Sequence, residues 1–407
     1  MRSYDKHRRK FCLLAFILLS VHPKIPAGPA KTAVFTGIDI LEAERFVRLQ
    51  GLRAGLITNY TGCNREGSRT IDLMRNSPNF TLIRVFSPEH GLYGDLDRKV
   101  DSFVDPQTKL TVYSLYGETR RPTADMLQGL DVLVFDIQDI GARFYTYITT
   151  MAYAMEAAGK AGVRFMVLDR PNPVNGRHVE GPVLDTHRLS FIGYYPLPVR
   201  HGMTVGELAQ LFKTENRLEV KLEVVKMEGW ERKLWFDETD LAWVNPSPNI
   251  RNLRQATLYT TTGLLESTNV SVGRGTDTPF EILGAPWIKT HELLHYLQKR
   301  TIVGVQFHKA EFTPTSDRYA GQRCQGVRLT VTDRSRFQSV ACGLELAKAL
   351  VHLYPKKFHS EELINRVGSE KVVEGILKDL PCEELIKVDE DPLKKFMQIR
   401  KSYLLYP

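Results

Sequence analysis

The chain has 407 residues, of which 43% are hydrophobic and 25% are charged, as is usual for a globular protein. This length is sufficient for two domains with separate cores. The formal net charge of +8 is concentrated at the start, because residues 1–30 hold six Lys or Arg and one Asp. The other residues carry 49 basic and 46 acidic side chains. They contain no basic run interleaved with aromatic residues, so nucleic acid is not an expected partner.

Residues 1–30 have the pattern of a secretory signal peptide. Four Lys or Arg lie within residues 6–10, and an apolar run follows over residues 11–21. This run is shorter than a membrane-spanning helix requires, and Ala27 and Ala30 are candidate cleavage positions after it. The alternative is an uncleaved membrane anchor. We expect a periplasmic or secreted protein that has no stable membrane span after signal removal.

The cysteine pattern does not indicate a zinc site. Beyond the leader there are four cysteines, and none of them forms a C-x-x-C pair. An oxidising compartment would permit a disulfide such as Cys324–Cys342, but the sequence does not fix the pairing.

Residues 31–185 alternate between strand and helix patterns. Strands are predicted over residues 52–58, 82–86, 110–115, 131–136 and 163–168, and helices over residues 41–49, 68–75, 123–127 and 148–161. The runs at 131–136 and 163–168 are continuously apolar, which is typical of strands covered on both faces. The pattern therefore predicts an α/β fold with a doubly wound parallel sheet.

Polar residues follow the carboxyl ends of four of these strands. They are Asn59; Glu89 and His90; Asp136, Gln138 and Asp139; and Asp169, Arg170 and Asn172, with Arg143 and Tyr145 shortly after Asp139. Ligands of doubly wound sheets bind beyond these ends. Any one of the residues could instead be a turn former or a helix cap. Four such segments together predict a site.

The motifs of several common enzyme classes are missing from the sequence. There is no G-x-G-x-x-G after the first strand, no G-x-x-x-x-G-K-[ST] and no G-x-S-x-G. We therefore expect no cofactor. His291 and His295 lack the glutamate of a zinc-protease motif, so we interpret them as part of a surface helix and expect no metal site there. The carboxylates at the strand ends favour acid/base chemistry or binding of a hard metal ion.

Residues 186–407 have a different pattern, which predicts a second domain. Thr204 and Glu207 form a capping box before a helix at 205–212, and residues 218–226 alternate like a strand. The two prolines within residues 243–249 exclude regular structure there. A polar stretch over residues 264–277 carries Glu266, Asn269 and Arg274, which could face the strand ends of the first domain. Beyond residue 290 we expect helices and strands that act as scaffold.

Five segments resemble the exo-β-N-acetylmuramidases of the NamZ/YbbC type. They are Gly-Leu-Ile-Thr-Asn (55–59), Ser-Pro-Glu-His-Gly (87–91), Asp-Ile-Gln-Asp-Ile-Gly-Ala-Arg-Phe-Tyr-Thr-Tyr (136–147), Leu-Asp-Arg-Pro-Asn-Pro (168–173) and Glu-Ser-Thr-Asn-Val-Ser-Val-Gly-Arg-Gly-Thr-Asp (266–277). Ser267 is a mild departure from the family pattern. The resemblance implies a Rossmann-like catalytic domain, at residues 31–185, and an α+β auxiliary domain, at residues 186–407, that contributes to the cleft.

The resemblance also implies an activity. The family releases terminal N-acetylmuramic acid from the non-reducing end of peptidoglycan fragments during cell-wall recycling. The expected partners are therefore peptidoglycan-derived disaccharides or glycan chains. The acid that corresponds to Glu89 is the prime catalytic candidate.

Glycoside hydrolysis needs a proton donor and a group that stabilises or traps the oxocarbenium-like centre. We hypothesise that Glu89 is the general acid. Asp136, Asp139, Asp169 or Glu266 could be the second carboxylate, or the 2-acetamido group of the substrate could act as internal nucleophile. The candidate substrate-binding residues are Asn59, His90, Gln138, Arg143, Tyr145, Arg170, Asn172, Asn269 and Arg274. Of these, Arg143, Arg170 and Arg274 could bind the lactyl carboxylate of the sugar.

Two functions of other classes remain open at this point. One is a sugar- or muropeptide-binding protein without turnover. The other is a metal-dependent hydrolase that uses Asp136, Asp139 and Asp169 with His90. The sequence decides neither the stereochemical course of the reaction nor the oligomeric state.

Overall fold

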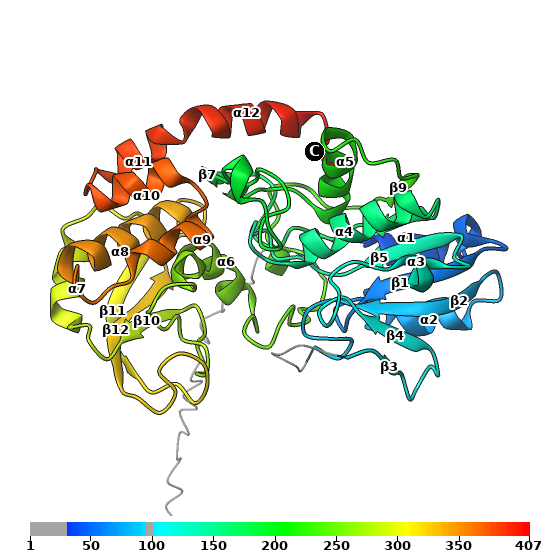
Figure 1. Cartoon of the computed structure of the whole chain (residues 1–407), viewed down its shortest axis with the longest axis horizontal. Coiled ribbons are helices and arrows are strands. Elements are labelled where there is room, and N and C mark those ends of the chain that lie inside the picture. The colour runs from blue at the N-terminus through cyan, green and yellow to red at the C-terminus, as the bar shows by residue number, and fades with distance from the viewer. Residues whose placement is uncertain (1–30, 95–100) are drawn as a thin grey trace, which may run out of the picture. The chain divides into compact units, whose positions relative to one another are not determined.

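The structure is a computed structural model that describes residues 31–94 and 101–407, so the predicted signal peptide lies outside the described residues. In this part of the chain, the larger sheet has the strand order β3-β4-β2-β1-β5-β6-β9 (Figure 1). Its strands are β1 (Arg53–Thr58), β2 (Thr81–Ser87), β3 (Phe103–Val104), β4 (Thr111–Ser114), β5 (Val132–Asp136), β6 (Arg164–Leu168) and β9 (Leu222–Val225). All neighbours are parallel except β3 and β4. The strand order reverses at β1, which places the topological switch point between β1 and β5.

Helices cover both faces of this sheet, as the doubly wound prediction requires. They are α1 (Gly37–Ala43), α2 (Thr70–Asn76), α3 (Ala124–Leu127), α4 (Tyr147–Lys160) and α5 (Val205–Glu215). Leu56 and Val134 pack in one apolar cluster with α1 and α2. Ile57 and Phe135, the next residues along the same strands, pack in the other cluster with α4 and α5. Successive side chains of a strand point to opposite faces, so continuously apolar strands bury both.

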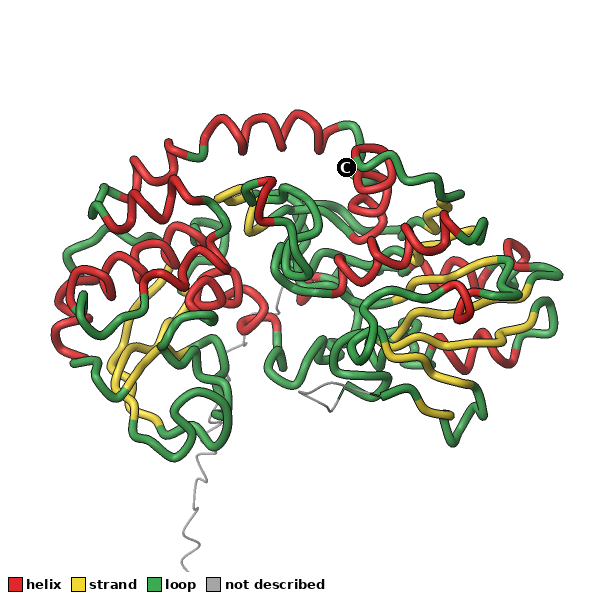
Figure 2. The backbone as a smooth tube through the Cα atoms, viewed as in Figure 1, coloured by secondary structure: helices red, strands yellow, loops and turns green. Residues whose placement is uncertain are grey.

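The second half of the chain contains a small antiparallel sheet with the order β10-β12-β11. Its strands are β10 (Ile282–Ala285), β11 (Val305–Phe312) and β12 (Cys324–Val331). The helices of this region are α6 (Leu253–Thr262), α7 (Thr290–Gln298), α8 (Ser339–Leu353), α9 (Ile364–Val367), α10 (Glu370–Leu377), α11 (Cys382–Val388) and α12 (Glu390–Lys401). A two-stranded antiparallel ribbon, β7 (Glu180–Val183) and β8 (Pro198–Arg200), precedes them in the chain. Figure 2 shows the strands of the two sheets as separate groups.

Two details differ from the sequence-based expectation. The helix expected at residues 41–49 is α1, which begins at Gly37 and ends at Ala43. Arg45 and Phe46 then adopt positive φ angles of 55° and 57°, which a helix cannot contain. The strand expected at 218–226 is β9, which pairs with β6 in the larger sheet. That sheet therefore extends beyond residue 185, where the sequence suggested a domain boundary.

The segment that follows α12 returns to the larger sheet. The Tyr406 hydroxyl donates a hydrogen bond of 2.6 Å to Oδ2 of Asp169, directly after β6. The backbone N–H of Leu405 donates to Glu207, and the carbonyl of Pro407 accepts from the N–H of Arg232. These bonds fix residues 405–407 against the end of the sheet.

Two further predictions concern membranes and disulfides. No helix within the described residues has both the length and the apolar character needed to cross a membrane. Cys63, Cys324, Cys342 and Cys382 carry free thiols, so the structure does not contain the Cys324–Cys342 disulfide.

Candidate active site

Glu89 lies in a sharp turn directly after β2. The strand ends at Ser87, and Pro88 cannot extend the ladder. His90 and Gly91 then have positive φ angles of 70° and 74°, which reverse the chain. The hydroxyl of Thr146, at the N-cap of α4, donates a hydrogen bond of 2.5 Å to Oε2 of Glu89. The carboxyl group of Glu89 is therefore held between the ends of two elements.

Glu89 and Thr146 line a cavity of about 550 Å³, a size suited to a small-molecule ligand. The two halves of the chain both contribute to its wall. The lining residues are Glu89, His90, Tyr116, Arg120, Phe144, Tyr145, Thr146, Ser190, Phe191, Ile192, Ser247, Asn249, Ile250, Tyr259, Glu266, Arg274, Phe280 and Arg366. We call this space the Glu89 cavity.

A second carboxylate of the cavity, Glu266, is held by two arginines. Arg274 Nη1 lies 2.9 Å from Oε1, and Arg366 Nη2 lies 2.8 Å from Oε2. Burial by itself lowers the pKa of the Arg366 guanidinium. The nearby negative charges, of which Glu266 is the strongest, outweigh burial, so the pKa of Arg366 is raised. Arg274 also pairs with Asp317 at 2.5 Å. The charge of Glu266 is therefore compensated within the protein.

Aromatic rings form much of the remaining cavity wall. The ring of Tyr259 lies 5.2 Å from that of Phe144, 5.8 Å from that of Tyr145 and 4.7 Å from that of Phe280. Burial raises the pKa of Tyr259, and the charge of Glu266 raises it further. The Tyr259 phenol is therefore neutral at physiological pH and can donate a hydrogen bond.

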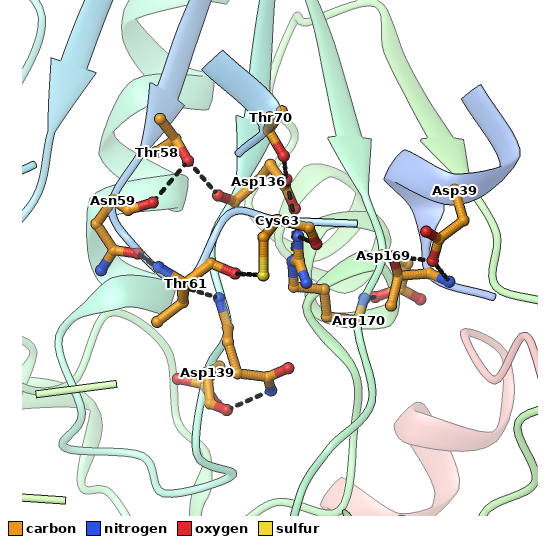
Figure 3. Close-up of polar contacts among 12 residues, drawn as sticks. Asp39, Thr58, Asn59, Thr61, Cys63, Thr70, Asp136, Asp139, Asp169 and Arg170 are labelled. Carbon is orange, nitrogen blue, oxygen red and sulfur yellow. Dashed lines mark hydrogen bonds and ion pairs between the residues drawn. The ribbon is translucent and has the colours of Figure 1, made fainter. Parts of the chain in front are cut away.

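A different group of predicted site residues lies near the switch point, and Figure 3 shows some of the contacts of Asn59, Asp136 and Arg170 there. Asp136 is fully buried and forms a two-pronged ion pair with Arg170, with Nε–Oδ1 and Nη2–Oδ2 distances of 2.6 and 2.9 Å. The Thr70 hydroxyl also donates to Asp136, and Arg170 donates to the carbonyl of Cys63. This pair, together with Asn59, Gln138, Asp139, Asp169 and Asn172, is called the switch-point cluster below.

Asp169 is also fully buried and has protein donors on both oxygens. Gly206 N donates to Oδ1, and the hydroxyls of Thr204 and Tyr406 donate to Oδ2. Burial raises the pKa of Asp169 to about 7, although these hydrogen bonds act in the opposite direction. Asp169 joins α5 and the segment after α12 to the end of β6.

The remaining members of the switch-point cluster hold loops. Asp139 Oδ2 accepts from Gly141 N at 2.7 Å, and the Gln138 side chain donates to the carbonyls of Asp139 and Pro171. The Asn172 side chain donates to the carbonyl of Met203 at 3.0 Å, and that of Asn59 donates to the Tyr147 hydroxyl at 3.1 Å. No member of the switch-point cluster lines the Glu89 cavity as the described residues form it.

Two other predicted substrate-binding residues have structural contacts instead. The fully buried Arg143 guanidinium donates to four backbone carbonyls, those of Pro182, Leu197, Arg366 and Val367. Burial lowers its pKa to about 9. Asn269 donates to the carbonyl of Lys357 and accepts from the N–H of His359. Neither residue lines the cavity.

The structure thus brings five predicted residues together in the cavity, namely Glu89, His90, Tyr145, Glu266 and Arg274. It adds residues that the sequence did not indicate, above all Thr146, Tyr259 and Arg366. Thr146 could have been found as the N-cap of the helix after Tyr145. Tyr259 and Arg366 lie in ordinary helical patterns that carry no such signal.

Among the described residues, the aspartates named for the metal-dependent alternative do not form a group with metal-ligand spacing. In the described parts of the chain, one group of at least three His, Cys, Asp or Glu has ligand atoms within 4.8 Å of one another: Asp185, His187 and Glu370. Arg188 forms an ion pair with Glu370 there. The three aspartates of the switch-point cluster do not form such a group, because each is bonded to a different part of the protein. His291 and His295 are exposed on α7.

Comparisons with known proteins identify the family. Residues 54–254 match the family described as exo-β-N-acetylmuramidase NamZ, N-terminal, and residues 257–406 match the corresponding C-terminal family. The chain belongs to the NamZ family. It is therefore a glycosidase.

Individual relatives agree with this assignment. The chain is 46% identical over 381 residues to a Bacillus subtilis protein named peptidoglycan β-N-acetylmuramidase NamZ, and the match covers 92% of both proteins. Crystal structures of two DUF1343 family proteins from Bacteroides fragilis have TM-scores of 0.85 and 0.75. They are 35% and 28% identical to this chain, and each match covers 92% of this chain and 99% of the other.

Proposed function

We propose that this NamZ-family protein is an exo-acting glycoside hydrolase that releases terminal N-acetylmuramic acid from the non-reducing end of peptidoglycan fragments, with Glu89 as general acid. The observation that carries the proposal is the placement of Glu89 in a ligand-sized cavity, with its carboxyl group held by Thr146. The activity in the name of the B. subtilis relative supports the choice of substrate.

The hydrogen bond from Thr146 suits the role of Glu89 as an acid. A general acid must present its proton to the leaving oxygen in a fixed direction. Thr146 donates to Oε2, so the carboxyl group is oriented and its own proton belongs on Oε1. Glu89 would then protonate the glycosidic oxygen as the bond to the anomeric carbon breaks.

The contacts of Glu266 favour the substrate's own 2-acetamido group as the nucleophile. Both oxygens of Glu266 lie within ion-pair distance of an arginine, and such compensation weakens a carboxylate as a nucleophile. The acetamido oxygen would attack the anomeric carbon while Glu89 protonates the leaving group. Water would then open the resulting oxazolinium ion and transfer a proton to the Glu89 carboxylate, which restores the acid, and the product would retain the β configuration.

The activity is tested with 4-nitrophenyl β-N-acetylmuramide, with and without a chelator. We expect nitrophenol release that the chelator does not affect. Sugar binding without release would instead support a binding protein, and release that stops with chelator would support a metal-dependent hydrolase.

The role of Glu89 is tested with Glu89→Gln on two substrates. Protonation matters most for a poor leaving group, so kcat/KM for a disaccharide with N-acetylmuramic acid at its non-reducing end should fall by about 10²- to 10⁴-fold. The loss on the nitrophenyl substrate should be smaller. The exposed Glu118→Gln variant is the matched control. Near-normal cleavage of the disaccharide by Glu89→Gln would exclude Glu89 as the acid.

Participation of the acetamido group is tested with substrates that carry one, two or three fluorine atoms on the acetyl methyl group. Fluorine withdraws electrons from the amide oxygen, so the rate should fall steeply along the series. A flat series, or an inverted product anomer in NMR spectra, would contradict participation.

We also propose that the protein is exported to the periplasm or the medium. The support is the basic and apolar pattern of residues 1–30. Fractionation and mass spectrometry should detect a mature chain that begins near residue 28 or 31. An intact chain in the membrane fraction would favour the anchor alternative.

A further inference from the structure

The cations of the Glu89 cavity differ in how their charges are compensated. The cavity wall contains the guanidinium groups of Arg120, Arg274 and Arg366. Arg366 pairs with Glu266, and Arg274 pairs with Glu266 and Asp317. Within the described residues, Arg120 has no carboxylate at ion-pair distance. Of the three, Arg120 is therefore the guanidinium whose charge no described carboxylate compensates.

Aromatic rings hold the Arg120 guanidinium in place. Its central carbon lies 4.2 Å from the ring centroid of Phe191 and 5.8 Å from that of Tyr116. The two rings are stacked on each other, with centroids 6.0 Å apart and an interplanar angle of 30°. The N–H donors of a guanidinium lie in its own plane and point away from a ring beneath it. They can therefore still form the two parallel bonds that a carboxylate accepts.

We propose that Arg120, supported by Tyr116 and Phe191, is the binding site for the lactyl carboxylate of the substrate. This inference rests on the proposed function, which supplies a sugar with one negative charge. Ser190, next to Phe191, also lines the cavity and adds a hydroxyl group. The ligand class is a carboxylate-bearing amino sugar, and the subsite selects it against neutral amino sugars.

Charge balance favours Arg120 over the other two arginines. A substrate carboxylate next to Arg274 or Arg366 would also lie close to Glu266, and like charges at short range repel. At Arg120 the same carboxylate would meet a guanidinium that no carboxylate of the described residues pairs with. Arg120 already lies over the Phe191 ring, so it should lose less freedom on binding than an arginine without such a contact.

The experiment compares 4-nitrophenyl β-N-acetylmuramide with its lactyl methyl ester, which differs in charge at one group. Wild type should prefer the acid. In Arg120→Gln, kcat/KM for the acid should fall by about 10- to 100-fold, the range for hydrogen bonds to charged groups, while the value for the ester changes little. Arg120→Lys keeps the charge without the fork and should give an intermediate acid-to-ester ratio.

The next residue in the chain provides the control. Arg121 pairs with Glu156 and lies 3.4 Å from the ring centroid of Tyr153, and it does not line the cavity. Arg121→Gln should keep the wild-type acid-to-ester ratio. A wild-type ratio in folded Arg120→Gln would overturn the inference, and so would a ratio that is lost in Arg274→Gln but kept in Arg120→Gln.

Failure of the proposed function gives a different result. If wild type cleaves neither substrate, the hydrolase proposal fails, and calorimetry with N-acetylmuramic acid and its methyl ester tests the subsite alone. A preference for the free acid that disappears in Arg120→Gln supports the subsite. Equal binding of acid and ester by wild type overturns it.

Discussion

The switch-point cluster and the Glu89 cavity contain the same kinds of side chain in opposite situations. In the switch-point cluster, Asp136 and Asp169 are fully buried, and each accepts three or more hydrogen bonds from the protein. In the cavity, Glu89 and Glu266 are half-buried and line a space of about 550 Å³. Carboxylates at strand ends can thus complete the fold or face a ligand.

The difference shows where a doubly wound sheet can place its site. Ligands of such sheets commonly bind at the switch point, here between β1 and β5. In this protein, the guanidinium of Arg170 pairs with Asp136 at the end of β5, and the hydroxyl of Tyr406 bonds to Asp169 directly after β6. The candidate site lies instead beyond β2, where the turn after Ser87 directs Glu89 toward residues of the second half of the chain.

The largest effect on stability is expected at Asp136, the residue that most clearly separates the switch-point cluster from the Glu89 cavity. Asp136→Asn leaves the Arg170 guanidinium buried without its counter-ion, which should lower the free energy of unfolding by about 3–5 kcal/mol. Urea denaturation measures this loss. The exposed pair Arg53–Asp131 offers the control, because solvent screens that pair and Asp131→Asn should lower the free energy of unfolding far less than Asp136→Asn does. A stable Asp136→Asn protein without turnover would return Asp136 to the list of catalytic candidates.

The raised pKa of Asp169 leads us to expect that the stability of the protein depends on pH. Its pKa is about 7 in the folded protein because of burial, and the negative charge of Glu207 adds to the shift; the ordinary value is 3.8. The folded state therefore binds this proton more tightly than the unfolded state. The stabilisation is fully present below pH 4 and is lost as the pH rises to 7, which amounts to about 2–4 kcal/mol.

Asp169→Asn should reduce the fall in unfolding free energy between pH 5 and pH 8. Part of the fall should remain, because burial also raises the pKa of Asp389 to about 7. Asp131→Asn should leave the fall intact, since the Arg53 pair lowers the pKa of Asp131 to about 2. An unchanged pH profile in Asp169→Asn would show that Asp169 is not the titrating group.

Arg143 is an intermediate case between the two regions. It lies outside the cavity, but it connects two segments of the cavity wall. Its guanidinium joins the loop that carries Thr146 to the backbone of Arg366, so it sets the distance between the two walls. Arg143→Lys leaves carbonyls unpaired and should cost about 1–3 kcal/mol of stability. It should also lower kcat more than it raises KM. Arg323→Lys, at an exposed pair, should change neither quantity. A raised KM with unchanged kcat would indicate direct substrate contact.

Much of the larger sheet follows from hydrophobic periodicity. The apolar runs at 131–136 and 163–168 are β5 and β6, and their flanking helices occupy both faces as expected. The strand at 218–226 could not be assigned to its sheet from the sequence. It is the edge strand β9, in which one residue is fully buried, and its alternating pattern is that of a strand with one exposed face. Pairing partners of edge strands depend on the tertiary structure.

The site was predicted in part. The Pro88 and Gly91 that follow β2 predicted that Glu89 lies at the edge of the sheet, where such sheets bind ligands, and Glu89 does line the cavity. Sequence position could not distinguish Glu89 from Asp136, because the difference depends on Arg170, which comes 34 residues after Asp136. Arg366 lies 100 positions after Glu266 in the chain, and only the fold brings the two within 2.8 Å.

The contact between Tyr406 and Asp169 also affects the order in which the protein can form. These residues are 237 positions apart in the chain. Asp169 therefore leaves the ribosome long before Tyr406 has been synthesised. Contacts at such a separation form late and slow folding. The end of the larger sheet at Asp169 therefore lacks this contact until the second half of the chain has been synthesised.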